Sequence, residues 1–102
     1  MPFALKFLAQ QIRISMDHAG LREVYASALY LAKRLEEAKS ELEIAAALGA
    51  PKWRIAYHRG LIEEATGHLA EAERNYEDAL RERPGWKAAD SRLKGLQALP
   101  RR

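Results

Sequence analysis

The sequence contains no cysteine, which excludes disulfide bonds and cysteine-ligated metal sites. Proline and glycine are also scarce, with four and six residues in 102, and most of them stand where a helix would have to stop. No apolar run approaches the roughly 20 residues that a membrane-spanning helix needs. The opening segment 1–9 is interrupted too soon for a signal peptide, so we expect a cytoplasmic protein.

Sequence motifs of catalysis and of cofactor binding are missing as well. There is no phosphate-binding loop, dinucleotide fingerprint or Ser/His/Asp order. The three histidines, His18, His58 and His68, show neither HExxH nor i, i+4 ligand spacing. The acidic pairs at 36–37 and 63–64 are adjacent residues, which do not face each other on a helix, and they indicate solvated faces. We therefore expect no enzyme, no cofactor and no metal site.

Alanine, leucine, glutamate, lysine and arginine are abundant, and these residues favour helices, so the composition predicts an all-α fold. Hydrophobic residues make up 48% and charged residues 30%, which suits a folded protein. The formal net charge is +3, but the basic residues are interleaved with acidic ones, which disfavours a nucleic-acid partner. A lesser alternative is a basic rim that binds RNA or an anionic surface. Its residues would be Arg13, Lys33, Arg34, Arg81, Arg83, Lys87, Arg92, Lys94, Arg101 and Arg102.

Apolar residues recur at helical spacing along nearly the whole chain. Lys33-Arg34 reads as a tight turn, and Gly49, Gly67 and Pro84 stand where helices are expected to end. The pattern predicts six helices, at about 3–14, 18–32, 35–48, 52–66, 69–83 and 86–99.

When the sequence is aligned with itself at an offset of 34 residues, similar residues coincide. Leu35 falls on Leu69 and Ala38 on Ala72. Small residues such as Gly60 and these alanines let paired helices approach closely. Since no single hairpin can bury its own apolar face, the hairpins must stack on one another. An ordinary helical bundle is the alternative fold.

The clearest copy of this repeat runs over 53–86. Its residues at fixed offsets are Gly60, Gly67, Leu69, Ala72, Tyr76, Ala79, Leu80 and Pro84. Because of these residues the chain resembles the tetratricopeptide repeat family, whose hairpins recur at intervals of about 34 residues. The resemblance implies a single domain over 1–102, an α-solenoid of about six helices in a right-handed superhelix. Its parts would be a half-repeat helix at 3–18, a degenerate repeat at 19–52, the best repeat at 53–86 and a capping helix at 87–99. The degenerate repeat has Lys33 where the family usually has glycine.

The resemblance implies a non-catalytic scaffold whose concave face binds a peptide or a partner helix. In this family the first helix of each hairpin usually lines that face. Repeats that bind chaperone C-terminal carboxylates use Lys and Asn where this chain has Glu23 and Ser27, so we disfavour a chaperone-tail receptor. The alternative for the tyrosines is that they pack within the stack. By register, the groove-facing residues are Glu23, Ser27, Tyr30, Leu31, Arg54, Tyr57, Leu61, Glu64 and Ser91.

Self-association is the main alternative function. In this interpretation the chain begins with half a hairpin, and the apolar residues of that helix lack a preceding partner helix. An exposed apolar stripe of this kind favours a symmetric dimer, or a dimer whose two copies exchange this helix. The residues concerned are Phe3, Phe7, Leu8 and Ile12.

Overall fold

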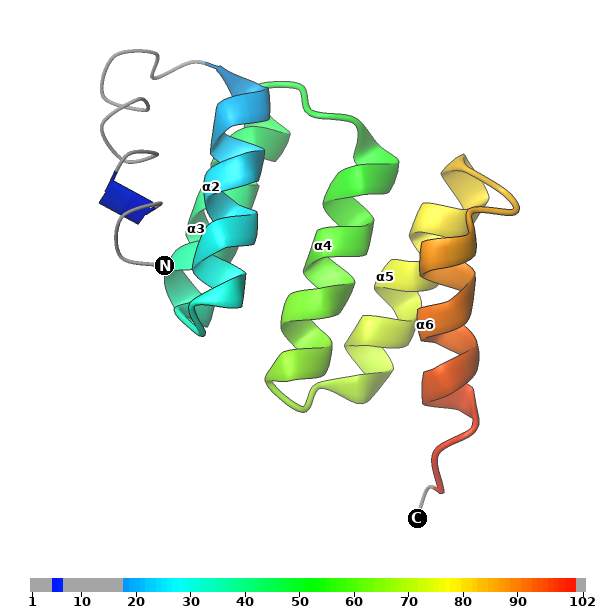
Figure 1. Cartoon of the computed structure of the whole chain (residues 1–102). Helices are drawn as coiled ribbons and strands as arrows, with labels where there is room; N and C mark the ends of the chain where they lie inside the picture. The colour runs from blue at the N-terminus through cyan, green and yellow to red at the C-terminus, as the bar shows by residue number, and fades with distance from the viewer. Residues whose placement is uncertain (1–4, 7–17, 101–102) are drawn as a thin grey trace. The chain divides into compact units, whose positions relative to one another are not determined.

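The computed structural model describes residues 5–6 and 18–100. This part of the chain is all helical apart from turns and contains no strand, so the predicted all-α class is confirmed. The helix bounds agree with the predicted ones to within two residues. The predicted helix at about 3–14 lies outside the described residues, except for Leu5 and Lys6, which are helical. The other five helices (Figure 1) are α2 (Ala19–Leu31), α3 (Leu35–Ala47), α4 (Lys52–Ala65), α5 (Leu69–Glu82) and α6 (Lys87–Gln97).

The chain divides into two compact units, Met1–Pro51 and Lys52–Arg102. The single-domain organisation over 1–102 stays a prediction. Within the described residues, no helix has the length and apolar character needed to cross a membrane.

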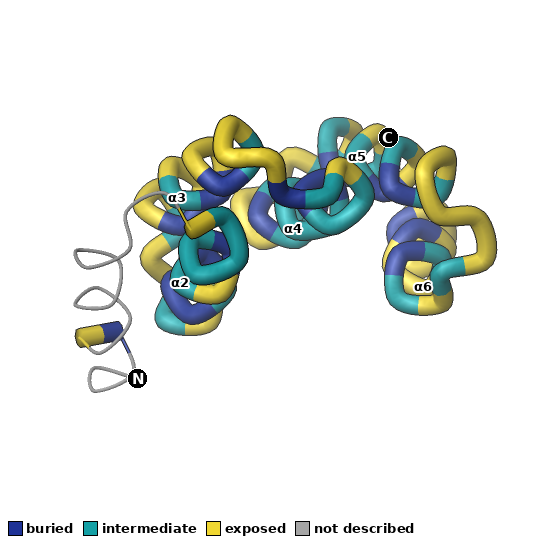
Figure 2. The backbone as a smooth tube through the Cα atoms, turned by 90° about the horizontal axis from the view of Figure 1, so that it is seen from above, coloured by how far each residue is buried: buried dark blue, intermediate teal, exposed yellow. Residues whose placement is uncertain are grey.

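The first unit contains the hairpin of α2 and α3. Leu29 of α2 and Leu42 of α3 are completely buried, and the small side chains of Ala26 and Ala38 are buried as well. Figure 2 shows buried and exposed positions alternating along the two helices. Because helical residues three or four apart share a face, the apolar spacing of the sequence produces this pattern.

The three turns after α2, α3 and α4 share one backbone design. In each, a residue with positive φ follows the helix, and the next amide donates to a carbonyl five residues back. After α3 and α4 the positive-φ residues are Gly49 (98°) and Gly67 (85°). After α2 it is Lys33, with φ 65°, followed by a bond of 2.9 Å from the Arg34 amide to the Leu29 carbonyl. Lysine thus adopts the conformation for which the family pattern has glycine, and its Cβ makes that conformation costly.

The second unit contains α4, α5 and α6. Tyr76 of α5 is completely buried, and a Cβ atom at Gly60 of α4 would collide with its ring. The ring also belongs to a core cluster with Leu93 and Leu96 of α6. Gly60 therefore lets α4 approach α5 closely, as the sequence predicts, and α6 covers the hairpin on the side of the tyrosine ring.

Candidate interaction surface

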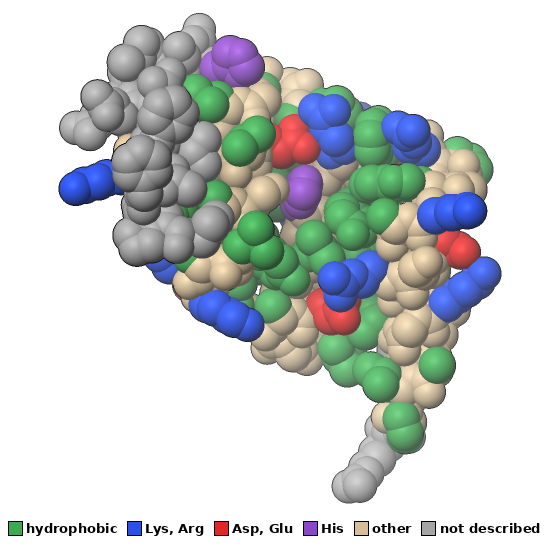
Figure 3. Space-filling view, in the orientation of Figure 1, with side chains coloured by type: hydrophobic (Ala, Val, Ile, Leu, Met, Phe, Trp, Pro, Cys, Tyr) green, Lys and Arg blue, Asp and Glu red, His purple; other side chains and the backbone are tan. Residues whose placement is uncertain are grey.

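Four of the predicted groove residues lie on one face of α4. Arg54, Tyr57, Leu61 and Glu64 are spaced by three, four and three residues, which places them along the same side of a helix. All four are half-buried. Figure 3 shows the mixed character of this side of the second unit, where hydrophobic and basic side chains lie next to one another. These four residues thus share one helix face, and their role in binding a partner stays a prediction.

Tyr57 packs among the aromatic residues of the second unit. Its ring centroid lies 4.6 Å from that of Trp86 and 5.8 Å from that of Tyr76. The Arg92 guanidinium of α6 lies near its hydroxyl group, which helps to raise the pKa of Arg92. Leu61 packs against the same core cluster. The alternative that the tyrosines pack within the stack therefore applies to Tyr57, although the residue is only half-buried.

Glu64 connects the three helices of the second unit. The Tyr76 hydroxyl donates a hydrogen bond of 2.7 Å to its Oε1 atom, and Arg92 Nη1 lies 3.5 Å from its Oε2 atom. Burial, followed by the hydrogen bond to this carboxylate, raises the pKa of Tyr76, so the phenol remains a neutral donor. With both carboxylate oxygens engaged, Glu64 acts mainly to hold α4, α5 and α6 together.

A second aromatic and cationic group borders this face. The rings of Trp53 and Trp86 meet edge to face, with centroids 4.8 Å apart and planes at 88°. The Arg83 guanidinium carbon lies 4.4 Å from the Trp53 centroid, and that of Arg54 lies 5.5 Å from it. These distances are within the range of cation–π attraction. Neither tryptophan is among the predicted groove residues, although Trp53 next to Arg54 at the start of the best repeat, and Trp86 at its end, are a usable signal.

The remaining predicted groove residues lie on other helices. Glu23 of α2 is buried, with 7% of its surface exposed, so it offers little area to a partner. Ser27 and Tyr30 are half-buried, and Leu31, at the end of the same helix, is 65% exposed. Ser91 is exposed on α6. The self-association residues Phe3, Phe7, Leu8 and Ile12 lie outside the described residues.

Comparisons with known proteins agree with this architecture. No protein-family model matches the sequence, and no curated protein matches it either. Among solved structures, the chain is similar to the first TPR of Spaghetti (RPAP3), which was solved bound to the HSP90 peptide SRMEEVD. The two are 24% identical with a TM-score of 0.82, over 92% of this chain and 75% of that chain. The chain therefore has the tetratricopeptide-repeat fold.

Proposed function

We propose that this chain is a non-catalytic protein-interaction module, which binds a peptide or a partner helix through its concave face. The observation that carries the proposal is the face of α4, on which Arg54 and Leu61 combine a cation with an apolar side chain at half-buried positions. Ser91 on α6, which belongs to the same unit, adds exposed surface. The structure with the same fold holds a peptide, which supports a peptide as the type of partner.

The chemistry of this surface suits a partner with an apolar anchor and an acidic group. The half-buried Leu61 and Tyr57 offer apolar contact, while the Arg54 guanidinium can form charge-assisted hydrogen bonds with a carboxylate. The Trp53 ring, against which Arg54 lies, provides a flat surface beside the cation. Aromatic residues and arginines of this kind supply most of the binding free energy in many interfaces.

A chaperone C-terminal tail is a poor candidate partner, although SRMEEVD is the peptide bound to the similar structure. When the sequence is aligned with the repeat pattern, Glu23 and Ser27 are expected at the positions where carboxylate-binding repeats have Lys and Asn. A glutamate in place of the lysine adds negative charge next to an acidic peptide, and a serine lacks the side-chain amide with which an asparagine donates to a carboxylate. We therefore expect SRMEEVD to bind this chain more weakly than a partner that is anchored on α4.

The test uses affinity capture from the source lysate with the full chain and two charge-reversed variants. Arg54→Glu changes the proposed surface, and Arg81→Glu is the matched control at an exposed position of α5. Arg54→Glu is expected to lose the captured partner, whereas Arg81→Glu is expected to retain it. If Arg54→Glu retains every partner while its circular dichroism stays native, α4 is not the binding face.

Self-association is the second candidate function, and one observation on α2 favours it. Val24 and Leu31 are 54% and 65% exposed, and their spacing of seven residues places them on one face of the helix. Such an apolar face can bind a second copy. Sedimentation at several protein concentrations, with Leu31→Arg as the variant, tests for self-association. A wild-type chain that stays monomeric at every concentration removes this candidate.

Binding of RNA through the basic rim is the weakest candidate. Arg81 forms an ion pair with Asp78, Lys94 lies 3.0 Å from Asp90, and Arg34 pairs with Glu37. Local pairing of this kind lowers the positive field that a phosphate backbone would meet. The cytoplasmic location expected from the sequence stays a prediction.

A further inference from the structure

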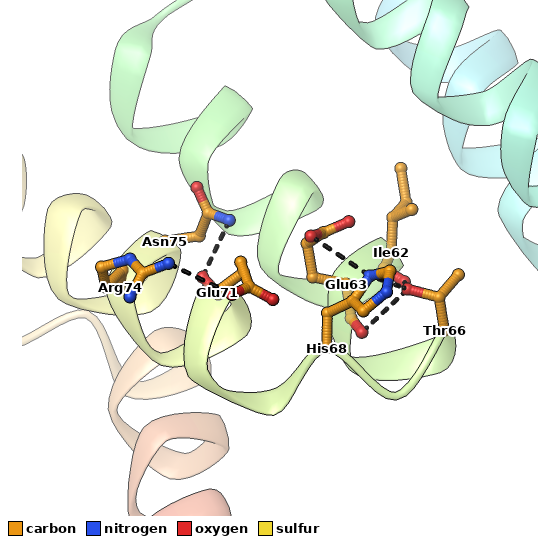
Figure 4. A network of polar contacts seen from close by, with 7 residues as sticks. All are labelled: Ile62, Glu63, Thr66, His68, Glu71, Arg74 and Asn75. Atoms are coloured by element: carbon orange, nitrogen blue, oxygen red, sulfur yellow. Dashed lines mark hydrogen bonds and ion pairs between the residues drawn. The ribbon is translucent and has the colours of Figure 1, made fainter.

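The turn between α4 and α5 brings together three side chains of the types that bind metal ions (Figure 4). Glu63 belongs to the last turn of α4, His68 directly precedes α5, and Glu71 belongs to the first turn of α5. One carboxylate oxygen of each glutamate and one ring nitrogen of the histidine all lie within 4.8 Å of one another. All three residues belong to the second unit.

The backbone of the turn holds these residues close together. The His68 amide donates a bond of 2.8 Å to the Glu63 carbonyl, and the Gly67 amide donates one of 3.1 Å to the Glu64 carbonyl. The Thr66 hydroxyl lies 3.1 Å from the Ile62 carbonyl oxygen, so it ties the turn back to α4. Because the backbone already fixes the three positions, binding a ligand there needs side-chain rotation only.

The side chains of this cluster are placed to exchange their present contacts for a metal ion. His68 Nδ1 lies 3.5 Å from Glu63 Oε2 and 3.1 Å from the Thr66 hydroxyl oxygen. Glu71 accepts a bond of 3.2 Å from Arg74, in an ion pair whose side chains are 45% and 67% exposed. Exposed pairs of this type contribute little free energy, so a metal ion can replace Arg74 at low cost.

We propose that Glu63, His68 and Glu71 bind one divalent transition-metal ion, with Zn²⁺ as the best match. Two carboxylates and a neutral imidazole supply a charge of about −2, which balances a divalent ion, and imidazole among the ligands favours Zn²⁺ over Mg²⁺ or Ca²⁺. Zinc bonds of about 2.0–2.2 Å require the ligand atoms to move closer than they now lie. The exposed side chains of His68 and Glu71 have the rotational freedom to do so.

The site would join the end of α4 to the start of α5, and water would fill the open coordination positions. The sequence expectation of no metal site rested on ligand spacings along a single helix. Glu63 and His68 are five residues apart across a turn, where the positive φ of Gly67 reverses the chain and brings them together. This proposal is independent of the proposed protein-interaction function.

The test is a titration of the full chain, without an affinity tag, with Zn²⁺. Calorimetry is expected to show one saturable ion per chain. Nuclear magnetic resonance of the histidine rings is expected to show perturbation of His68 and not of His58 or His18, whose Nδ1 atom accepts a bond from the Leu21 amide. His68→Ala and Glu71→Gln should each weaken binding by about tenfold or more, since each removes a ligand.

Glu77→Gln is the matched control, because it removes the same charge from an exposed position of the same helix. It is expected to keep the wild-type affinity for Zn²⁺. The proposal is overturned if no saturable binding is seen up to about 1 mM Zn²⁺, if the ion perturbs His18 or His58 instead, or if Glu71→Gln and Glu77→Gln bind equally well. The Glu71→Gln comparison and the wild-type spectra decide the question even if His68→Ala fails to fold.

Discussion

The ring of Tyr76 occupies the space that any side chain at Gly60 would need. The contact joins the middle of α4 to the middle of α5, and it sets the distance between the two helices. It also explains why a glycine, normally unfavourable inside a helix, stands there.

Gly60→Ala is expected to destabilise the chain, although alanine is the better helix former. The added methyl group would overlap a ring that is fully buried and has no room to retreat, and overpacking of this kind costs about 1–3 kcal/mol. Gly95→Ala on α6 is the matched control, because nothing lies within 4 Å of the added atom. It should stabilise the chain by roughly 0.5–1 kcal/mol. Urea unfolding measures both, and equal effects of the two substitutions would contradict the packing argument.

Lys33→Gly is expected to stabilise the first unit. The lysine has a φ of 65°, which glycine adopts without the steric cost of a Cβ atom, and the gain should be about 1 kcal/mol. Gly67→Ala, at a φ of 85°, should show the opposite sign. Thermal unfolding by circular dichroism compares the variants. A destabilised Lys33→Gly would mean that the lysine side chain contributes more than its backbone strain costs.

Tyr76→Phe should cost about 1–3 kcal/mol, because it removes a hydrogen bond donated to a carboxylate and leaves Glu64 with one partner fewer. Glu64→Gln keeps an acceptor for the hydroxyl and should cost less. Unfolding in denaturant measures the two variants. A Tyr76→Phe chain as stable as wild type would show that the hydroxyl contributes no net stability.

The same tyrosine should make the fold sensitive to alkali. Its pKa is raised in the folded chain, first by burial and then by Glu64, so folding favours the protonated phenol. The resulting stability is complete below the pKa of an unfolded tyrosine, about 10, and falls as the pH rises above that value. The difference in stability between wild type and Tyr76→Phe should therefore shrink above about pH 10, which unfolding curves at several pH values can measure. A constant difference would contradict this linkage.

Arg83→Ala should destabilise the second unit by roughly 0.5–1 kcal/mol, because it removes a cation from the face of Trp53. Arg83→Lys should lose part of this stabilisation, since a guanidinium stacks on a ring better than an ammonium does. Lys87→Ala, at an exposed position of α6, is the control and should be neutral. If Lys87→Ala and Arg83→Ala have the same effect, net charge and not the ring contact is responsible.

The sequence predicted the helices well because their signals are local. Glycine at 49 and 67 and the proline at 84 end helices through backbone geometry, and the small residue at Gly60 indicates close approach wherever its partner lies. The candidate site was harder to predict. Tyr57 is on the expected face of α4, but its contact with Trp86 depends on the path of the chain into α6. The meeting of Glu63, His68 and Glu71 depends on a turn, and helical periodicity says nothing about distances across a turn.

The contact between Trp53 and Trp86 has a practical consequence for experiments on this chain. These are its two tryptophans, and both belong to the second unit, whereas α2 carries the tyrosines Tyr25 and Tyr30. Fluorescence excited at a wavelength that only tryptophan absorbs therefore reports chiefly on the second unit. Far-ultraviolet circular dichroism, by contrast, reports on the helices of both units. Coincident transitions by the two probes would reveal one cooperative folding block, and separated transitions would reveal two.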